Sequence, residues 1–191
     1  MLPLIVIFAK APIPGRVKTR LGVDPARAVE LHSSFVRQTL LMLQSLRSEA
    51  DVELSTDEPT QAWSEFEVAR SVQCSGQLGE RIYSALEKAL AAGRPKALIL
   101  GSDSPGLPAA HVRALLASPA DACLGPVEDG GFYAIACGRT DPAMFEGVRW
   151  STASTLSDTV RALANFGLSV ELGPAWFDVD RPEDLTRLGA Q

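Results

Sequence analysis

Apolar and polar residues alternate along the chain in blocks that predict strands and helices in turn. Two blocks are uninterrupted apolar runs, Leu2–Ala9 and Ala97–Leu100, and such runs are typical of central strands buried on both faces. Apolar residues recur at helical spacing over Pro25–Arg47 and Leu78–Ala92, which predicts two amphipathic helices. Gly93 stands where the second of these helices should end.

Shorter segments complete the pattern. Further strands are expected at Val52–Ser55, Val68–Cys74, Ala122–Gly125, Phe132–Cys137 and Ser169–Leu172, and further helices at Thr60–Phe66, Pro108–Leu116, Ser154–Phe166 and Pro182–Leu188. Alternating strands and helices predict an α/β fold, with a largely parallel sheet and helices on both faces. No repeat, low-complexity tract or linker interrupts the 191 residues, so we expect one domain over 1–191.

The composition narrows the class of protein. A net charge of −5 argues against a general nucleic-acid-binding surface. The apolar run at the start is too short for a membrane span, and it precedes its first positive charge, the reverse of the order in a signal peptide. Three scattered cysteines and two histidines provide neither a disulfide framework nor a zinc site. We therefore expect a cytoplasmic protein that binds no nucleic acid and spans no membrane.

A basic loop follows the first predicted strand. The segment 10–20 holds prolines and a glycine together with four cations, Lys10, Arg16, Lys18 and Arg20. Its glycine spacing matches neither a P-loop nor a dinucleotide fingerprint. Lysine and arginine can nevertheless hold phosphate oxygens by charge-assisted hydrogen bonds. A solvated basic loop is the alternative, because four cations on a loop are common.

Carboxylates follow other strands. Asp103 comes directly after a buried strand, where it can hold Mg²⁺ or Mn²⁺, or can instead cap the helix near Pro108. Asp178 and Asp180 lie two residues apart, which places both side chains on one side of an extended segment, as a metal site would use. The alternative is that Asp180 forms a capping box with Glu183.

Two further segments have both a structural and a functional interpretation. Asp129-Gly130-Gly131 is a common tight-turn sequence, and its glycines could also let a ligand approach the backbone. The segment 150–152 can cap a helix or contact a substrate. Because ligands bind α/β sheets beyond the carboxyl ends of the strands, we expect the basic loop, the segment 102–104 and the segment 128–131, which each follow a strand, to meet at one edge.

Five of these segments, taken in order, resemble the motifs of the DUF2064 family. They are Phe8–Leu21, Gly101–Pro105, Gly125–Tyr133, Trp150–Thr152 and Asp178–Asp180. The family comprises small bacterial proteins of the glycosyltransferase-A type, similar in fold to phospholactate guanylyltransferases. The resemblance implies a three-layer α/β/α nucleotide-diphospho-sugar transferase fold. Its mixed sheet would be mainly parallel, with Phe132–Cys137 as the one reversed strand.

The resemblance also implies roles for individual residues. Asp103 and Asp129 would be catalytic, and Asp103 and Asp180 would bind Mg²⁺ or Mn²⁺. The donor's nucleotide and phosphates would contact Lys10, Arg16, Lys18, Thr19, Arg20 and Ser102. The acceptor would contact Gly130, Gly131, Trp150, Ser151 and Thr152.

The expected function is metal-dependent glycosyl transfer from a nucleotide sugar to a small-molecule acceptor. One alternative is a nucleotidyltransferase that uses a nucleoside triphosphate and a phosphorylated small molecule, since a basic loop suits either polyphosphate. A second alternative is a catalytically weak nucleotide-binding module. Gln77 and Gly106 motivate it, because they stand where similar proteins often have aspartate.

Overall fold

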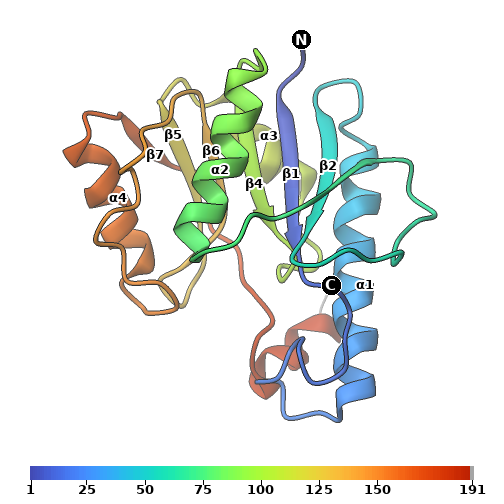
Figure 1. Cartoon of the computed structure of the whole chain (residues 1–191). Coiled ribbons are helices and arrows are strands. Elements are labelled where there is room, and N and C mark those ends of the chain that lie inside the picture. Colours follow the sequence, from blue (N-terminus) through green and yellow to red (C-terminus); the bar gives the residue numbers. More distant parts are fainter. Residues whose placement is uncertain (190–191) are drawn as a thin grey trace.

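The computed structural model describes residues 1–189, and its centre is a seven-stranded sheet in the order β3-β2-β1-β4-β6-β5-β7 (Figure 1). The strands are β1 (Leu4–Ala9), β2 (Asp51–Thr56), β3 (Ala69–Val72), β4 (Ala97–Gly101), β5 (Ala122–Pro126), β6 (Phe132–Cys137) and β7 (Val170–Leu172). Each expected strand is present, with ends that shift by only a few residues.

One strand of the sheet is reversed. β6 pairs antiparallel with both β4 and β5, whereas the other neighbouring strands pair in parallel. The tight turn between β5 and β6 explains the reversal, because a short hairpin connection can join only antiparallel strands. Gly130 supplies the positive φ of 88° that this turn needs, and Oδ1 of Asp129 accepts the Gly131 N–H at 3.1 Å. The mixed, mainly parallel α/β architecture is confirmed.

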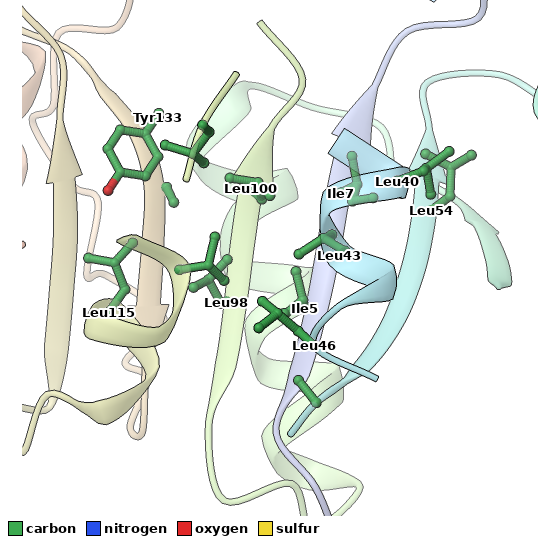
Figure 2. Close-up of a cluster of buried hydrophobic side chains, with 14 of the residues drawn as sticks. Ile5, Ile7, Leu40, Leu43, Leu46, Leu54, Leu98, Leu100, Leu115 and Tyr133 are labelled. Atoms are coloured by element: carbon green, nitrogen blue, oxygen red, sulfur yellow. The ribbon is translucent and has the colours of Figure 1, made fainter. Parts of the chain in front are cut away.

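Helices cover both faces of the sheet. Within residues 1–189, α1 (Pro25–Gln44) and α3 (Ala109–Ala117) pack on one face, and α2 (Leu78–Ala91) and α4 (Thr155–Asn165) pack on the other. Figure 2 shows Leu40 beside Leu54 of β2 and Leu46, just beyond the end of α1, beside Ile5 of β1, with Leu43 between them. None of the helices in this part of the chain is both long enough and apolar enough to cross a membrane.

The predicted helix at Thr60–Phe66 is wrong. The segment forms turns, and Trp63 has a φ of 60°, which lies outside the helical region. Burial of the Trp63 indole explains the difference. The ring packs edge-on against His32 of α1 at 5.9 Å between centroids, and its N–H donates to the backbone oxygen of Ser33 at 3.1 Å. A tertiary contact therefore overrides the local helical spacing.

The end of the described chain differs in detail from the expectation. The closing helix is a 3₁₀ helix, η1 (Pro182–Gly189). The alternative in which Asp180 forms a capping box with Glu183 is wrong, because the carboxylate that accepts the backbone N–H groups here belongs to Asp184. Its Oδ2 accepts the backbone N–H groups of Asp180 at 3.0 Å and Arg181 at 2.9 Å. The Asp180 carboxylate is thereby left for another partner.

Parallel pairing brings the polar segments to one edge of the sheet. β1, β4, β5 and β7 all run in the same direction, so their carboxyl ends share the lower edge in Figure 1. The red segment after β7 returns beneath the sheet to lie beside the blue loop after β1 and the lower end of α1. A small apolar cluster of Leu21, Phe35 and Val179 joins these three parts.

Candidate functional site

A buried lysine joins two carboxylates at this edge. Nζ of Lys18 lies 2.6 Å from Oδ1 of Asp103 and 2.9 Å from Oδ1 of Asp180. Its third hydrogen bond, of 2.7 Å, goes to the backbone oxygen of Val179. An ammonium group has three donors, so all of them are used. The structure thus brings together Asp103, which follows β4, and Asp180, which follows β7.

Burial is distributed unequally within this cluster. The Lys18 side chain is 3% exposed, whereas the side chains of Asp103 and Asp180 are each 44% exposed. Burial by itself lowers the pKa of Lys18, but the charges and hydrogen bonds of the two carboxylates more than offset it, so the pKa is raised. Lys18 therefore remains an ammonium group, and its buried positive charge offsets the negative charges of Asp103 and Asp180.

The backbone at Lys18 is strained in a way that aims the side chain. Its φ is 48°, in the left-handed region that residues with a Cβ atom rarely occupy. Such a conformation persists only where the surroundings hold it, and it is frequent at functional sites. Here the ammonium lies 5.5 Å from the centre of the Phe35 ring, a cation–π contact that helps to hold it.

A third carboxylate adjoins the cluster. Asp178 accepts a hydrogen bond from the hydroxyl of Ser104, which comes one residue after Asp103. Burial raises the pKa of Asp178 to about 7. The hydrogen bond from Ser104 and the charge of Lys18 work against this rise, whereas the negative charges of Asp103 and Asp180 add to it. The Asp178-x-Asp180 spacing does place both side chains toward the same group of charges.

The basic loop divides into buried and exposed cations. Arg16 forms an ion pair with Glu58, and Nζ of Lys10 lies 3.5 Å from the backbone oxygen of Arg16. Lys10, Arg16, Thr19 and Arg20 are all exposed at the carboxyl edge, whereas Lys18 points inward. The exposed members can reach a phosphate directly. Phosphate binding by the loop stays a prediction, and Lys18 as placed has no free donor for it.

His32 and Asp57 hold the start of the basic loop. Nε2 of the buried His32 lies 2.9 Å from the backbone oxygen of Lys10 and donates to it, and burial lowers the pKa of this imidazole. Oδ1 of Asp57 accepts the Ala11 N–H at 2.6 Å. Neither residue stands out in the sequence, because each acts on a backbone group far away in the chain.

Asp129 lines a cavity together with Asp178 and Asp180. A cavity of about 250 Å³ is bordered by Asp129, Asp178 and Asp180, with Phe177 and Arg181 also on its wall. Asp129 is exposed, and its carboxylate both stabilises its own turn and faces this space. The tight-turn interpretation is therefore correct, and it leaves the predicted catalytic role of Asp129 open.

The predicted acceptor residues lie next to one another. A Cβ atom on Gly130 would lie 2.1 Å from the backbone oxygen of Ala153, so the group that approaches this glycine is the chain's own backbone. Ser151 has a φ of 59°, and the Thr152 hydroxyl donates to the backbone oxygen of Arg149 at 3.0 Å. Trp150 packs edge-on against Phe132 at 6.2 Å between ring centroids. Acceptor binding by these residues stays a prediction.

The alternative that Asp103 caps the following helix has no support in the structure. α3 begins after Pro108, and no side chain forms a cap hydrogen bond there. Asp103 instead pairs with Lys18.

The carboxylates of Asp103 and Asp180 suit a hard divalent cation. In the hydrogen bonds of the described residues each uses only Oδ1, toward Lys18, so each Oδ2 has room for another ligand. No three Asp, Glu, His or Cys side chains within residues 1–189 form a ready-made metal site. Mg²⁺ typically takes one or two carboxylates and completes its shell with water and substrate phosphates. Two exposed carboxylates on a rigid base fit that pattern.

Comparison with known proteins identifies a matching protein family. The sequence profile of a family described as "Uncharacterized protein conserved in bacteria (DUF2064)" matches residues 35–152. A search of curated proteins finds no match.

Solved structures match nearly the whole chain. A "putative nucleotide-diphospho-sugar transferase" from Desulfovibrio desulfuricans G20 has 33% sequence identity and a TM-score of 0.88, covering 98% of this chain and 87% of that one. The 4-diphosphocytidyl-2C-methyl-D-erythritol synthase from Anaerococcus prevotii DSM 20548 has 12% identity and a TM-score of 0.63, covering 99% and 97%. A CMP:2-keto-3-deoxy-manno-octonic acid synthetase solved with CTP has 15% identity and a TM-score of 0.64, covering 100% and 98%. The chain therefore has a nucleotide-diphospho-sugar transferase fold, which it shares with cytidylyltransferases.

Proposed function

The chain belongs to the DUF2064 family, and we propose that it is a metal-dependent glycosyltransferase that uses a nucleotide diphospho-sugar as donor. One observation carries the proposal. At the carboxyl edge of the sheet, Asp103 and Asp180 both form ion pairs with the buried ammonium of Lys18, and each aspartate side chain remains 44% exposed. Two rigid, accessible carboxylates beside exposed cations suit a ligand that contains both a metal ion and a diphosphate.

Each part of the site has a task in this reaction. Lys10, Arg16 and Arg20 lie on the exposed side of the basic loop, where they bind the donor's diphosphate. Asp103 and Asp180 hold Mg²⁺ or Mn²⁺, which when bound offsets negative charge on the departing diphosphate. Lys18 acts through the carboxylates, because it fixes their separation and lowers their mutual repulsion.

The chemical step moves one glycosyl group. The bond between the sugar's anomeric carbon and the diphosphate oxygen breaks, and its electron pair leaves with the nucleoside diphosphate. A hydroxyl oxygen of the acceptor forms the new bond to that carbon. Asp129 accepts the hydroxyl proton, and the exposure of its carboxylate on the wall of the 250 Å³ cavity supports this role.

Substitution of Asp103 tests the proposal. Calorimetry with Mn²⁺ and a panel of nucleoside diphosphates and nucleotide sugars should show metal-dependent binding to the native chain. In Asp103→Asn that binding should weaken at least about tenfold, while the melting temperature stays close to native. Asp51→Asn is the matched control, since Asp51 is 50% exposed but starts β2 at the amino edge. Unchanged Mn²⁺ and nucleotide affinity in Asp103→Asn would show that Asp103 is not a metal ligand.

The products separate this proposal from its alternatives. Release of a nucleoside diphosphate from a sugar nucleotide supports glycosyl transfer. Release of pyrophosphate from a nucleoside triphosphate and a phosphorylated acceptor supports nucleotidyl transfer instead. Saturable nucleotide binding without any product would identify a nucleotide-binding module, as Gln77 and Gly106 suggest in the sequence.

A further inference from the structure

A second cavity opens beside the N-terminus of α2. It has a volume of about 510 Å³ and lies between the start of α2 and the loop before α4. Such a volume suits a small molecule. We call it the aromatic cavity, and the side chains that define its chemistry are Gln77, Glu80, Tyr83, Phe145, Glu146 and Trp150.

The aromatic wall of this cavity is held rigidly. A Cβ atom on Gly79 would lie 2.9 Å from the Trp150 indole, so the ring packs directly on the backbone of α2. Phe145 contacts the same indole edge-on at 5.6 Å between ring centroids, and Phe132 does so at 6.2 Å. A glycine at position 79 therefore has a clear purpose, which is to let Trp150 form one wall of the cavity.

Trp150 links the aromatic cavity to the turn that carries Asp129. Phe132, which supports Trp150, begins β6 directly after Gly131. The segment after Trp150 is bonded to the same turn, since the Leu156 N–H donates to the backbone oxygen of Gly130 at 2.8 Å. Packing of Phe132 on Trp150 and this hydrogen bond therefore connect the wall of the aromatic cavity to the turn that carries the proposed base.

Charge in the aromatic cavity is opposite to that of the basic loop. Two carboxylates, Glu80 and Glu146, line it, and none of the described residues on its wall is lysine or arginine. A carboxylate already stands at the N-terminus of α2, because Oε2 of Glu80 accepts the Gln77 N–H at 2.6 Å. A phosphate here would meet two negative charges and no positive charge.

We propose that the aromatic cavity binds the acceptor, and that the acceptor is a neutral, polyhydroxylated molecule such as a sugar or polyol rather than a phosphorylated one. The inference rests on the proposed function. Flat C–H surfaces of such a molecule pack on the negative faces of Tyr83, Phe145 and Trp150. Its hydroxyl groups donate to Glu80, Glu146 and Gln77. Electrostatic repulsion by the carboxylates selects against a phosphorylated acceptor.

Nuclear magnetic resonance can test the selectivity directly on the whole chain. The protein has three tryptophans, so three indole N–H signals are expected, and Trp150→Phe identifies that of Trp150. The probes are glucose, myo-inositol and glycerol, each titrated beside its monophosphate. At least one neutral probe should shift the Trp150 signal saturably and bind more tightly than its phosphate. Should the variant fail to fold, Trp63→Phe and Trp176→Phe assign the same signal by elimination.

A charge reversal sharpens the test. Glu146 is exposed, so Glu146→Lys should fold normally. It should shift the preference toward the phosphorylated member of each pair by about tenfold, as expected for reversing one charge near a phosphate in a largely aqueous site. Glu87→Lys is the matched control, because Glu87 is an exposed residue of α2 outside the aromatic cavity, and it should change nothing.

The outcomes separate this inference from the proposed function. No Trp150 shift with any probe, or a native preference for the phosphates, would overturn the acceptor assignment while leaving nucleotide binding at Asp103 untouched. A selective Trp150 shift without Mn²⁺-dependent nucleotide binding would overturn the proposed function and keep the neutral-ligand site.

Discussion

The Lys18 cluster (Lys18, Asp103, Asp180) and the Asp158 cluster (Asp158, Arg149, Arg161) arrange charge in opposite ways. In the first, the cation is 3% exposed and the two carboxylates are 44% exposed. In the second, the carboxylate is 1% exposed and the two arginines are 65% exposed. Each cluster therefore buries the charge that is shared and leaves the pair around it in solvent.

The difference lies in which atoms remain available. Both oxygens of Asp158 are used, Oδ2 by the backbone N–H and Nε of Arg149, and Oδ1 by the terminal nitrogens of Arg149 and Arg161. In the Lys18 cluster the three donors of the buried ammonium are all used, but the side chains of Asp103 and Asp180 are each 44% exposed and contact Lys18 through Oδ1 alone. A cluster in which every oxygen of a buried carboxylate accepts hydrogen bonds stabilises the fold. A cluster in which a buried lysine holds two partly exposed carboxylates can also bind a ligand.

Removal of the buried cation should have the largest effect on stability. Lys18→Met leaves Asp103 and Asp180 close together without a counter-charge and should lower the free energy of unfolding by about 3 kcal/mol. Urea denaturation at pH 7 measures this loss of stability. Lys88→Met, at an exposed position of α2, is the control. Equal stability of the two variants would mean that Lys18 does not hold the acids.

Asp178 should make the Lys18 region sensitive to pH. Its pKa is about 7 in the folded protein, above the ordinary 3.8, so the folded state binds an extra proton between these values. The stabilisation is complete below about pH 4 and is lost as the pH rises through 7. Asp178→Asn keeps an acceptor for Ser104 and should add on the order of 2 kcal/mol at pH 8, with little change at pH 4. Urea denaturation of the native protein and of Asp178→Asn, with a chelator present, measures the free energy of unfolding from pH 4 to 8. If the two free energies differ by the same amount at every pH, the prediction is wrong.

The Asp158 cluster should show a smaller effect with the opposite pH dependence. The hydrogen bonds of Arg149 hold the pKa of Asp158 at about 2, below the ordinary 3.8. Its contribution is therefore present above pH 4 and is lost as the pH falls toward 2. Asp158→Asn should lower the melting temperature at pH 7. At pH 2 the melting temperatures of the variant and the native protein should differ less than at pH 7.

The Asp158 variant also provides the functional contrast. Nucleotide and Mn²⁺ affinity should match the native protein, because the cluster has no free oxygen for a ligand. A double-mutant cycle with Arg161→Gln isolates the pair. Loss of nucleotide binding in Asp158→Asn would remove the distinction between a structural and a binding cluster.

Much of the fold and the membership of the site could be predicted from local patterns. Leu4–Ala9 and Ala97–Gly101 are strands because uninterrupted apolar runs must be buried on both faces. Asp103 and Asp180 could be singled out because each follows a strand, and carboxyl ends of parallel strands share an edge. The failure at Thr60–Phe66 marks the limit, since Trp63 takes its conformation from a contact with α1.

The alternation of elements and the reversed strand after Asp129-Gly130-Gly131 follow from local sequence patterns, because each depends on neighbours in the chain. The role of Lys18 depends on long-range contacts. A basic loop predicts phosphate binding, yet Lys18 points inward and forms ion pairs with Asp103 and Asp180. Asp180 is 162 residues away from Lys18 in the chain. Likewise, Gly79 and Trp150 look unrelated in the sequence, and packing alone makes them one wall of a cavity. Burial and pairing depend on long-range contacts, and they convert the same residue types into either a support or a binding site.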